Sequence, residues 1–155
     1  MPKRPLSPRN AAFIAGGAVV LVDQLTKWWA ATVLPGNPIS LIGDFLQLRY
    51  HTNSGAAFSM LQGSGSIIAL VAIAVVLFIA LVVRSVPYRP EAIALGLVLG
   101  GAVGNLIDRV FRGGGFLDGE VIDFVDFSFF PAFNAADSAI TIGAALALIF
   151  AFIRE

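Results

Sequence analysis

The 155-residue chain contains no cysteine and a single histidine, His51, and only 13% of its residues are charged. Without cysteine there is no disulfide framework and no thiolate nucleophile, and one histidine is too few for a zinc protease helix. Ten basic residues balance ten acidic ones, so no basic field attracts nucleic acid. We therefore expect no metal, no cofactor and no nucleic-acid partner, and chemistry that depends on carboxylates, hydroxyls, two lysines and His51.

Apolar residues make up 57% of the chain, before its 16 glycines are counted. A soluble domain usually carries about 25% charged residues, roughly twice the share found here. Such a composition cannot cover a water-soluble globule with polar side chains, which indicates that lipid surrounds most of the chain. We expect one membrane-embedded domain, residues 1–155, without an internal repeat or a linker.

Four apolar stretches of about 20 residues follow one another along the chain. A helix of this length spans about 30 Å, the thickness of a hydrocarbon core. The pattern predicts an all-α membrane protein, a bundle of four transmembrane helices with a small extracytoplasmic β or loop element built from the first outer segment. The expected helices cover about 11–34, 64–83, 91–110 and 134–153, and the expected outer segments cover about 35–63 and 111–133.

The basic residues fix the expected orientation, because lysine and arginine near the ends of spans remain in the cytoplasm. Six of them fall on one side: Lys3, Arg4, Arg9, Arg84, Arg89 and Arg154. Both termini are therefore expected in the cytoplasm and the two outer segments outside. The basic tail and first apolar run also have the form of a signal peptide, but the run continues past charged residues, which favours an uncleaved signal-anchor over a removed signal.

Asp23, Asp108 and Asp137 fall in the predicted spans, in the outer half of the bilayer. Charges at this depth cost a few kcal/mol each, so they usually face the protein interior. Asp23 and Lys27 are four residues apart with the acid first, which favours an ion pair within the helix. Glycine at every fourth position from Gly96 to Gly104 predicts close packing of the third helix against a neighbour.

Asp123, in VIDF (121–124), ends the second outer loop, and Asp137 opens the fourth helix. Two aspartates brought together can share one proton, because like charges about 3 Å apart cannot both ionise. The ionised member can then take a proton from water while the protonated member polarises a scissile carbonyl, as in aspartic proteolysis. From the spacing alone, an ion or proton pathway and a purely structural acid cluster remain open alternatives.

Five motifs together are more specific than any one of them: DQLTK (23–27), TNSGAAFS (52–59), GGAVGNLIDR (100–109), VIDFVDF (121–127) and FNAADSAI (133–140). In this order, over four predicted spans, the chain resembles the lipoprotein signal peptidases (signal peptidase II), aspartic proteases of the bacterial inner membrane. The resemblance covers nearly the whole chain.

The resemblance implies an endopeptidase that removes the signal peptide of a prolipoprotein, cutting before a diacylglyceryl-modified cysteine at the outer leaflet of the inner membrane. Its partners would be this prolipoprotein and membrane lipid, and no oligomer is implied. Asp123 and Asp137 match the two catalytic aspartates. The positions that match the family's supporting and substrate-contacting polar residues are Asp23, Lys27, Asn53, Asn105, Arg109 and Asn134.

The connection between Arg109 and Asp123 departs from the family pattern. It reads FRGGGFLDGE, with three consecutive glycines, and is longer than is usual in the family. A mobile flap is one expected outcome. The departure also leaves Asp126 open as an alternative to Asp123, although VIDF favours Asp123.

Overall fold

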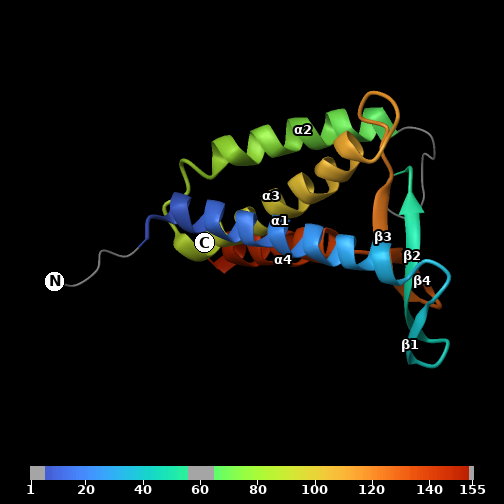
Figure 1. Cartoon of the computed structure of the whole chain (residues 1–155). Coiled ribbons are helices and arrows are strands. Elements are labelled where there is room, and N and C mark those ends of the chain that lie inside the picture. The colour runs from blue at the N-terminus through green and yellow to red at the C-terminus, as the bar shows by residue number, and fades with distance from the viewer. Residues whose placement is uncertain (1–5, 56–64, 154–155) are drawn as a thin grey trace.

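The computed structural model describes residues 6–55 and 65–153, which form a helix bundle with an antiparallel sheet at one end (Figure 1). Each described helix overlaps one of the four predicted apolar stretches. The helices are α1 (Pro8–Val33), α2 (Gly65–Val82), α3 (Arg89–Phe111) and α4 (Ala135–Ile153). The strands are β1 (Ile39–Ile42), β2 (Leu46–Asn53), β3 (Val121–Phe127) and β4 (Phe130–Phe133).

Three of these helices, α2, α3 and α4, are long and apolar enough to cross a membrane. Helix α1 has 26 residues and is longer than the other three, but it is not among them. Its sequence is interrupted by charge: Asp23 and Lys27 lie within it and are both 0% exposed. Composition therefore identifies three candidate spans. The sequence of α1 is less apolar because it contains buried ionic groups that contact other elements.

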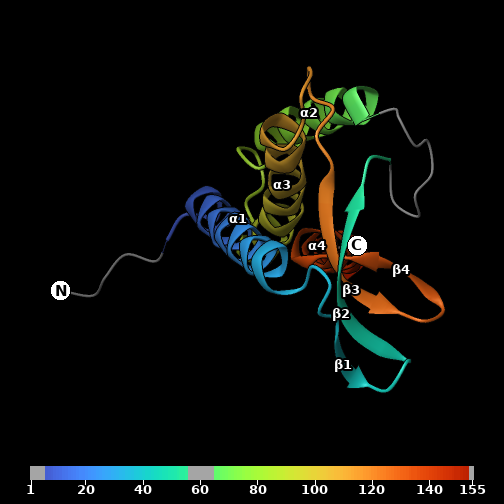
Figure 2. The ribbon, with the colours of Figure 1, turned by 45° about the vertical axis from the view of Figure 1, so that its right-hand side comes forward.

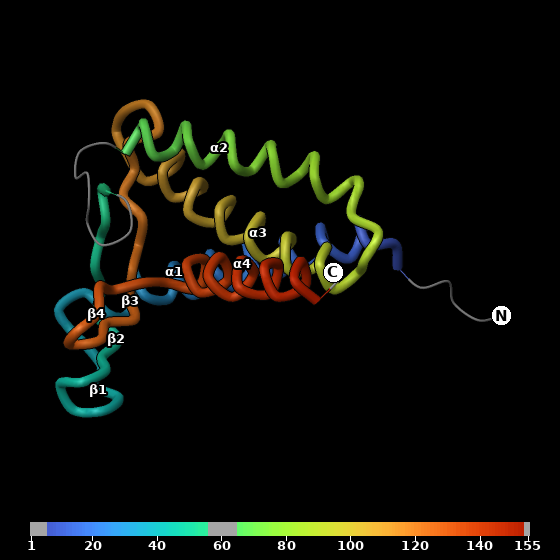
Figure 3. The backbone as a smooth tube through the Cα atoms, turned by 180° about the vertical axis from the view of Figure 1, so that it is seen from behind, coloured from blue at the N-terminus to red at the C-terminus, as the bar shows by residue number. Residues whose placement is uncertain are grey.

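Helix α3 lies between the other helices and contacts all three of them (Figures 2 and 3). Glycine makes the closest of these contacts possible. A methyl group at Gly96 would collide with the Ala12 carbonyl of α1, and one at Gly100 would collide with the Gly16 carbonyl. The predicted packing role of the glycine stripe is confirmed, because the α3 backbone approaches that of α1 closely where α3 carries no side chain.

The sheet has the strand order β1-β2-β3-β4, and all of its neighbouring strands are antiparallel. Two expectations were wrong here. Asp123 lies within β3 rather than at the end of a loop, and the outer element is built from both outer segments rather than from 35–63 alone. The first four residues of β3 are all buried, so the strand lacks the alternation of polar and apolar residues that marks a half-exposed strand.

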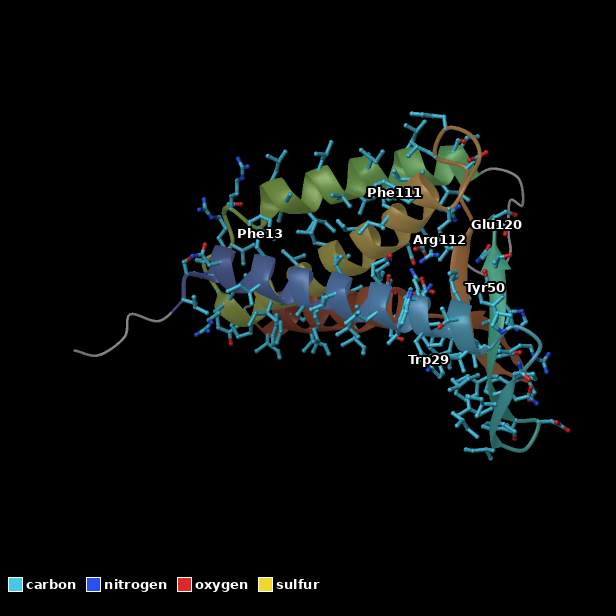
Figure 4. All side chains as sticks on the ribbon, in the orientation of Figure 1. Phe13, Trp29, Tyr50, Phe111, Arg112 and Glu120 are labelled. Atoms are coloured by element: carbon cyan, nitrogen blue, oxygen red, sulfur yellow. The ribbon has the colours of Figure 1, made fainter. Side chains whose placement is uncertain are left out.

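One face of the sheet packs on the end of α1. Ile122 and Phe124 of β3 form a buried cluster with Ala30 and Leu34, and Trp29 and Tyr50 pack against it (Figure 4). This cluster fixes the sheet at the end of the bundle where α1 ends. Residues 56–64, which include the end of the TNSGAAFS motif, lie outside the described residues.

The long glycine-containing connection folds against the start of α2. Ser66 Oγ donates a hydrogen bond to the Phe116 carbonyl at 2.7 Å, and Gly115 N donates to Asp118 Oδ1 at 2.9 Å. Gly119 N donates to the Arg109 carbonyl at 3.0 Å. These contacts tie the middle of the connection to α2 and its end to α3, and its behaviour as a mobile flap remains a prediction.

Candidate active site

Asp137 is held in the first turn of α4 by a reciprocal pair of capping bonds. The Asn134 side-chain oxygen accepts from Asp137 N at 3.0 Å, and Asp137 Oδ2 accepts from Asn134 N at 3.2 Å. This is the geometry of a capping box, in which two otherwise unpaired N–H groups at a helix start are satisfied. The pattern Asn-Ala-Ala-Asp therefore begins the helix and also fixes the Asp137 carboxylate.

Asp123 reaches the same asparagine from β3. Its carboxylate is 4% exposed, and its Oδ1 accepts a hydrogen bond from Asn134 Nδ2 at 2.7 Å. Its Oδ2 accepts from Asn53 Nδ2 at 3.3 Å. Asn134 thus contacts both aspartates, one through its side-chain amide and the other through its backbone and side-chain oxygen.

Asn105, on α3, connects Asp137 to the buried ion pair of α1. Its Nδ2 donates to Asp137 Oδ1 at 2.8 Å, and its Oδ1 accepts from Lys27 Nζ at 2.8 Å. Asn134 Nδ2 also approaches Asn105 Oδ1, at 3.3 Å. Side chains from α1, α3, β3 and the start of α4 therefore meet in one hydrogen-bonded network.

Lys27 lies between two buried carboxylates. Its Nζ is 2.8 Å from Asp23 Oδ2 and 2.9 Å from Asp108 Oδ2, and all three side chains are 0% exposed. The predicted pair within α1 is confirmed, but the second partner comes from α3. Asp23 also reaches α4, where its Oδ1 accepts from Ala136 N at 2.9 Å. The ion pair therefore links three helices.

Asp108 and Gln24 were not among the predicted site residues, although Asp108 was expected to face the interior. Asp108 accepts from Ile122 N of β3 at 3.2 Å and from Arg112 Nε at 2.9 Å. Gln24 Nε2 donates to carboxylate oxygens of Asp23 and Asp108, each at 3.2 Å. Gln24 follows Asp23 in DQLTK, but its partner across the helix interface could not be read from the sequence.

Arg109 is 5% exposed and donates to two backbone carbonyls of its own chain. One guanidinium nitrogen lies 2.5 Å from the Gly55 carbonyl oxygen, and the other lies 3.3 Å from the Gly119 carbonyl oxygen. The arginine therefore joins the end of β2 to the end of the long connection.

Burial and, to a smaller extent, the nearby negative charge of Asp137 raise the pKa of Asp123 to about 6. The hydrogen bonds from Asn134 and Asn53 oppose this pKa shift, because they stabilise the carboxylate. Asp126, the alternative candidate, bonds instead to His51, whose Nε2 lies 3.1 Å from Asp126 Oδ2. Of the two acids of β3, Asp123 is the one bonded to Asn134.

A cavity of about 570 Å³ opens beside Asp123 and extends along the sheet. Its lining is mostly polar and comes from β2, β3, β4 and their turns. Within residues 6–55 and 65–153, no three histidine or acidic side chains are grouped in a way suited to a metal ion. The lining residues are Asp44, Gln47, Arg49, His51, Thr52, Asn53, Asp123, Asp126, Phe127, Ser128, Phe130, Pro131 and Ala132.

Comparison with known proteins identifies the family. A lipoprotein signal peptidase of Rhodococcus jostii is 45% identical over 146 residues, which cover 94% of this chain and 74% of the relative. One from Anoxybacillus flavithermus is 41% identical over 150 residues, covering 92% of this chain and 86% of the relative. A solved structure of a bacterial membrane enzyme superposes with a TM-score of 0.82 at 32% identity, over 94% of this chain and 88% of that one. The signal peptidase (SPase) II family profile matches residues 15–153, and the chain accordingly belongs to the signal peptidase II family, whose members are membrane proteases.

Proposed function

We propose that this chain is an aspartic endopeptidase that removes the signal peptide from diacylglyceryl-modified prolipoproteins, cutting before the lipidated cysteine. The observation that carries the proposal is the contact of Asn134 with both Asp123 and Asp137. The names of the relatives from Rhodococcus and Anoxybacillus support the lipoprotein substrate. The long apolar helices of the bundle are consistent with a substrate whose signal peptide and acyl chains lie in lipid.

In this mechanism the two aspartates share one proton. Asp123 carries it, because burial raises its pKa, and donates a hydrogen bond to the scissile carbonyl oxygen. Asp137 is the ionised base, because negative charge is favoured in the first turn of a helix and its oxygens accept from Asn105 and from Asn134 N. Water adds to the carbonyl carbon and gives its proton to Asp137. The C–N bond then breaks as this proton passes to the leaving amine of the lipidated cysteine.

The remaining polar residues support the pair in different ways. Asn53 and Asn134 hold the Asp123 carboxylate, and Asn105 holds that of Asp137. Asp23 and Lys27 fix the α1 side of the network and orient Asn105 through the Lys27 ammonium. Arg109 holds the Gly55 carbonyl, and so positions the end of β2 beside the substrate.

We further propose that all four helices span the bacterial inner membrane, with both termini in the cytoplasm and the aspartates at the outer leaflet. At a rise of about 1.5 Å per residue, α1 is long enough to cross, and its charged groups face α3 rather than lipid. The basic residue Arg9 lies at the start of α1, Arg84 lies in the link between α2 and α3, and Arg89 is the first residue of α3. These segments lie at the end of the bundle opposite the sheet (Figure 1).

Substitution of the two aspartates tests the proposal. Asp123→Asn and Asp137→Asn should each reduce cleavage of a lipidated precursor by at least about 10³-fold, and the double variant should lose little more, because the residues act as a unit. Glu120→Gln removes an exposed carboxylate next to β3 and serves as the matched control (Figure 4). Normal cleavage by either single variant, in protein that still inserts in the membrane, would exclude this mechanism.

A further inference from the structure

The polar cavity extends well beyond Asp123, and the proposed mechanism uses only the part of it that lies beside this aspartate. Gln47, Arg49 and His51 of β2 line it, and they alternate with Leu48 and Tyr50, which pack toward α1. Successive side chains of a strand point to opposite faces. The cavity therefore lies on the face of the sheet that is turned away from the apolar cluster at the end of α1.

Asp126 shares this face with Asp123, although residues three apart in a regular strand point to opposite sides. Phe124 and Val125 both pack in the apolar cluster, and the β2–β3 register shifts between Leu48 and His51, the partners of Val125 and Asp123. The irregularity turns Asp126 into the cavity. There its Oδ2 lies 3.1 Å from His51 Nε2 and 3.8 Å from an Arg49 guanidinium nitrogen.

The charges in the cavity are unequal. Apart from Asp123, which carries the shared proton in the proposed mechanism, two acids line it, Asp44 and Asp126, against a single arginine, Arg49. Arg49 and His51 both lie beside Asp126, so the positive charge of Arg49 is already opposed by a carboxylate. Asp44 lies in the turn between β1 and β2, where it accepts a hydrogen bond from the neutral side chain of Gln47. A bound peptide would therefore meet an excess of negative charge.

A substrate peptide that is cleaved beside Asp123 extends on both sides of the scissile bond. The signal peptide is apolar and belongs with the helices, whereas the chain that follows the cysteine is destined for water. The polar cavity begins at Asp123 and extends along the sheet, away from the apolar cluster. We infer that this cavity binds the first residues after the lipidated cysteine, and that it favours basic side chains over acidic ones there. The inference rests on the proposed function.

Three lipidated peptides that differ only at the second and third residues after the cleaved bond test this selectivity. These residues are two lysines, two glutamines or two glutamates, and kcat/KM is measured in neutral detergent at low salt. A partly exposed charge interaction changes binding by up to about fivefold. We expect the wild type to prefer the lysine peptide to the glutamate peptide by about three- to fivefold, with a smaller ratio at high salt.

The Asp126→Asn variant tests whether the cavity is the cause of this preference. The substitution removes one acid and leaves Arg49 without its acidic partner. The ratio of kcat/KM for the lysine peptide to that for the glutamate peptide should therefore fall to about one. The exposed Glu120→Gln, which lies outside the cavity, should keep the wild-type ratio. An equal rate for all three peptides with wild type, or an unchanged ratio in Asp126→Asn, would overturn the inference.

The glutamine peptide separates this inference from the proposed function. If the wild type cleaves it and Asp123→Asn does not, the peptidase mechanism stands whatever the charge preference is. If Asp123→Asn cleaves it normally, the mechanism fails, and the proposed placement of the peptide fails with it.

Discussion

Asn134, the residue just before α4, donates a hydrogen bond from its side-chain Nδ2 to Asp123 Oδ1, and the two atoms are 2.7 Å apart. The same side chain accepts from Asp137 N through its oxygen. One residue thus performs a structural task, the start of a helix, and also fixes two carboxylates, one on β3 and one on α4. These two tasks can be separated by substitution.

We predict that Asn134→Ser and Asn134→Ala differ in stability but not in their loss of activity. Serine can still cap the helix, whereas alanine cannot and should cost about 1 kcal/mol. Neither side chain reaches Asp123, so both variants should lose activity. Because the lost hydrogen bond lowered the pKa of Asp123, which acts in its protonated form, the alkaline limb of the residual pH–rate profile should move to higher pH. Thermal unfolding in detergent and pH–rate profiles check both parts, and a serine variant with wild-type activity would contradict the shared role.

The raised pKa of Asp123 predicts a pH-dependent gain in stability for Asp123→Asn. The folded-state pKa of about 6 exceeds the ordinary aspartate pKa of 3.8, so the folded protein favours the protonated acid. Wild-type stability should therefore decline between pH 4 and pH 6 and lose up to about 3 kcal/mol from this group above that range. The asparagine variant avoids this loss. Its melting temperature should exceed that of the wild type at pH 7.5 and approach it at pH 4.

The Glu120→Gln variant controls for the removal of a carboxylate as such, since Glu120 is exposed. It should not alter the melting temperature at either pH. An Asp123→Asn variant with the same advantage at pH 4 and pH 7.5 would show that ionisation of Asp123 is not the cause.

Lys27 should be more sensitive to removal than an ordinary ion-pair residue. Lys27→Met leaves the carboxylates of Asp23 and Asp108 buried without the ammonium between them, which should cost about 3–5 kcal/mol. We expect little folded protein in the membrane. The double variant Asp23→Asn/Lys27→Met removes one acid together with the base, and should recover part of the folded yield because Arg112 still neutralises Asp108. Equal yields of the single variant and the wild type would argue against this balance of charges.

The sequence predicted those features that depend on local spacing. Asp23 and Lys27 are one helical turn apart, so their contact needs no knowledge of the fold. Asp108 could not be assigned as the second partner of Lys27, because this contact depends on how α1 and α3 are rotated against each other. The four-stranded sheet was missed for a similar reason. β2 and β3 are separated by two helices, and the burial of β3 on both faces removes its periodic signal.

The contact between α1 and α3 allows a matched test of glycine packing. A methyl group at Gly100 would collide with the Gly16 carbonyl and lie 2.8 Å from Val19 Cβ, whereas one at Gly17 would meet nothing within 4 Å. Gly100→Ala must separate two backbones and should cost about 1–3 kcal/mol. Gly17→Ala should be neutral or stabilising, because alanine has the higher helix propensity. Melting temperatures in detergent compare the two variants. Since α3 carries Asn105, the separation should also reduce cleavage in Gly100→Ala, and equal stability and activity of the two variants would show that the helices do not need this close approach.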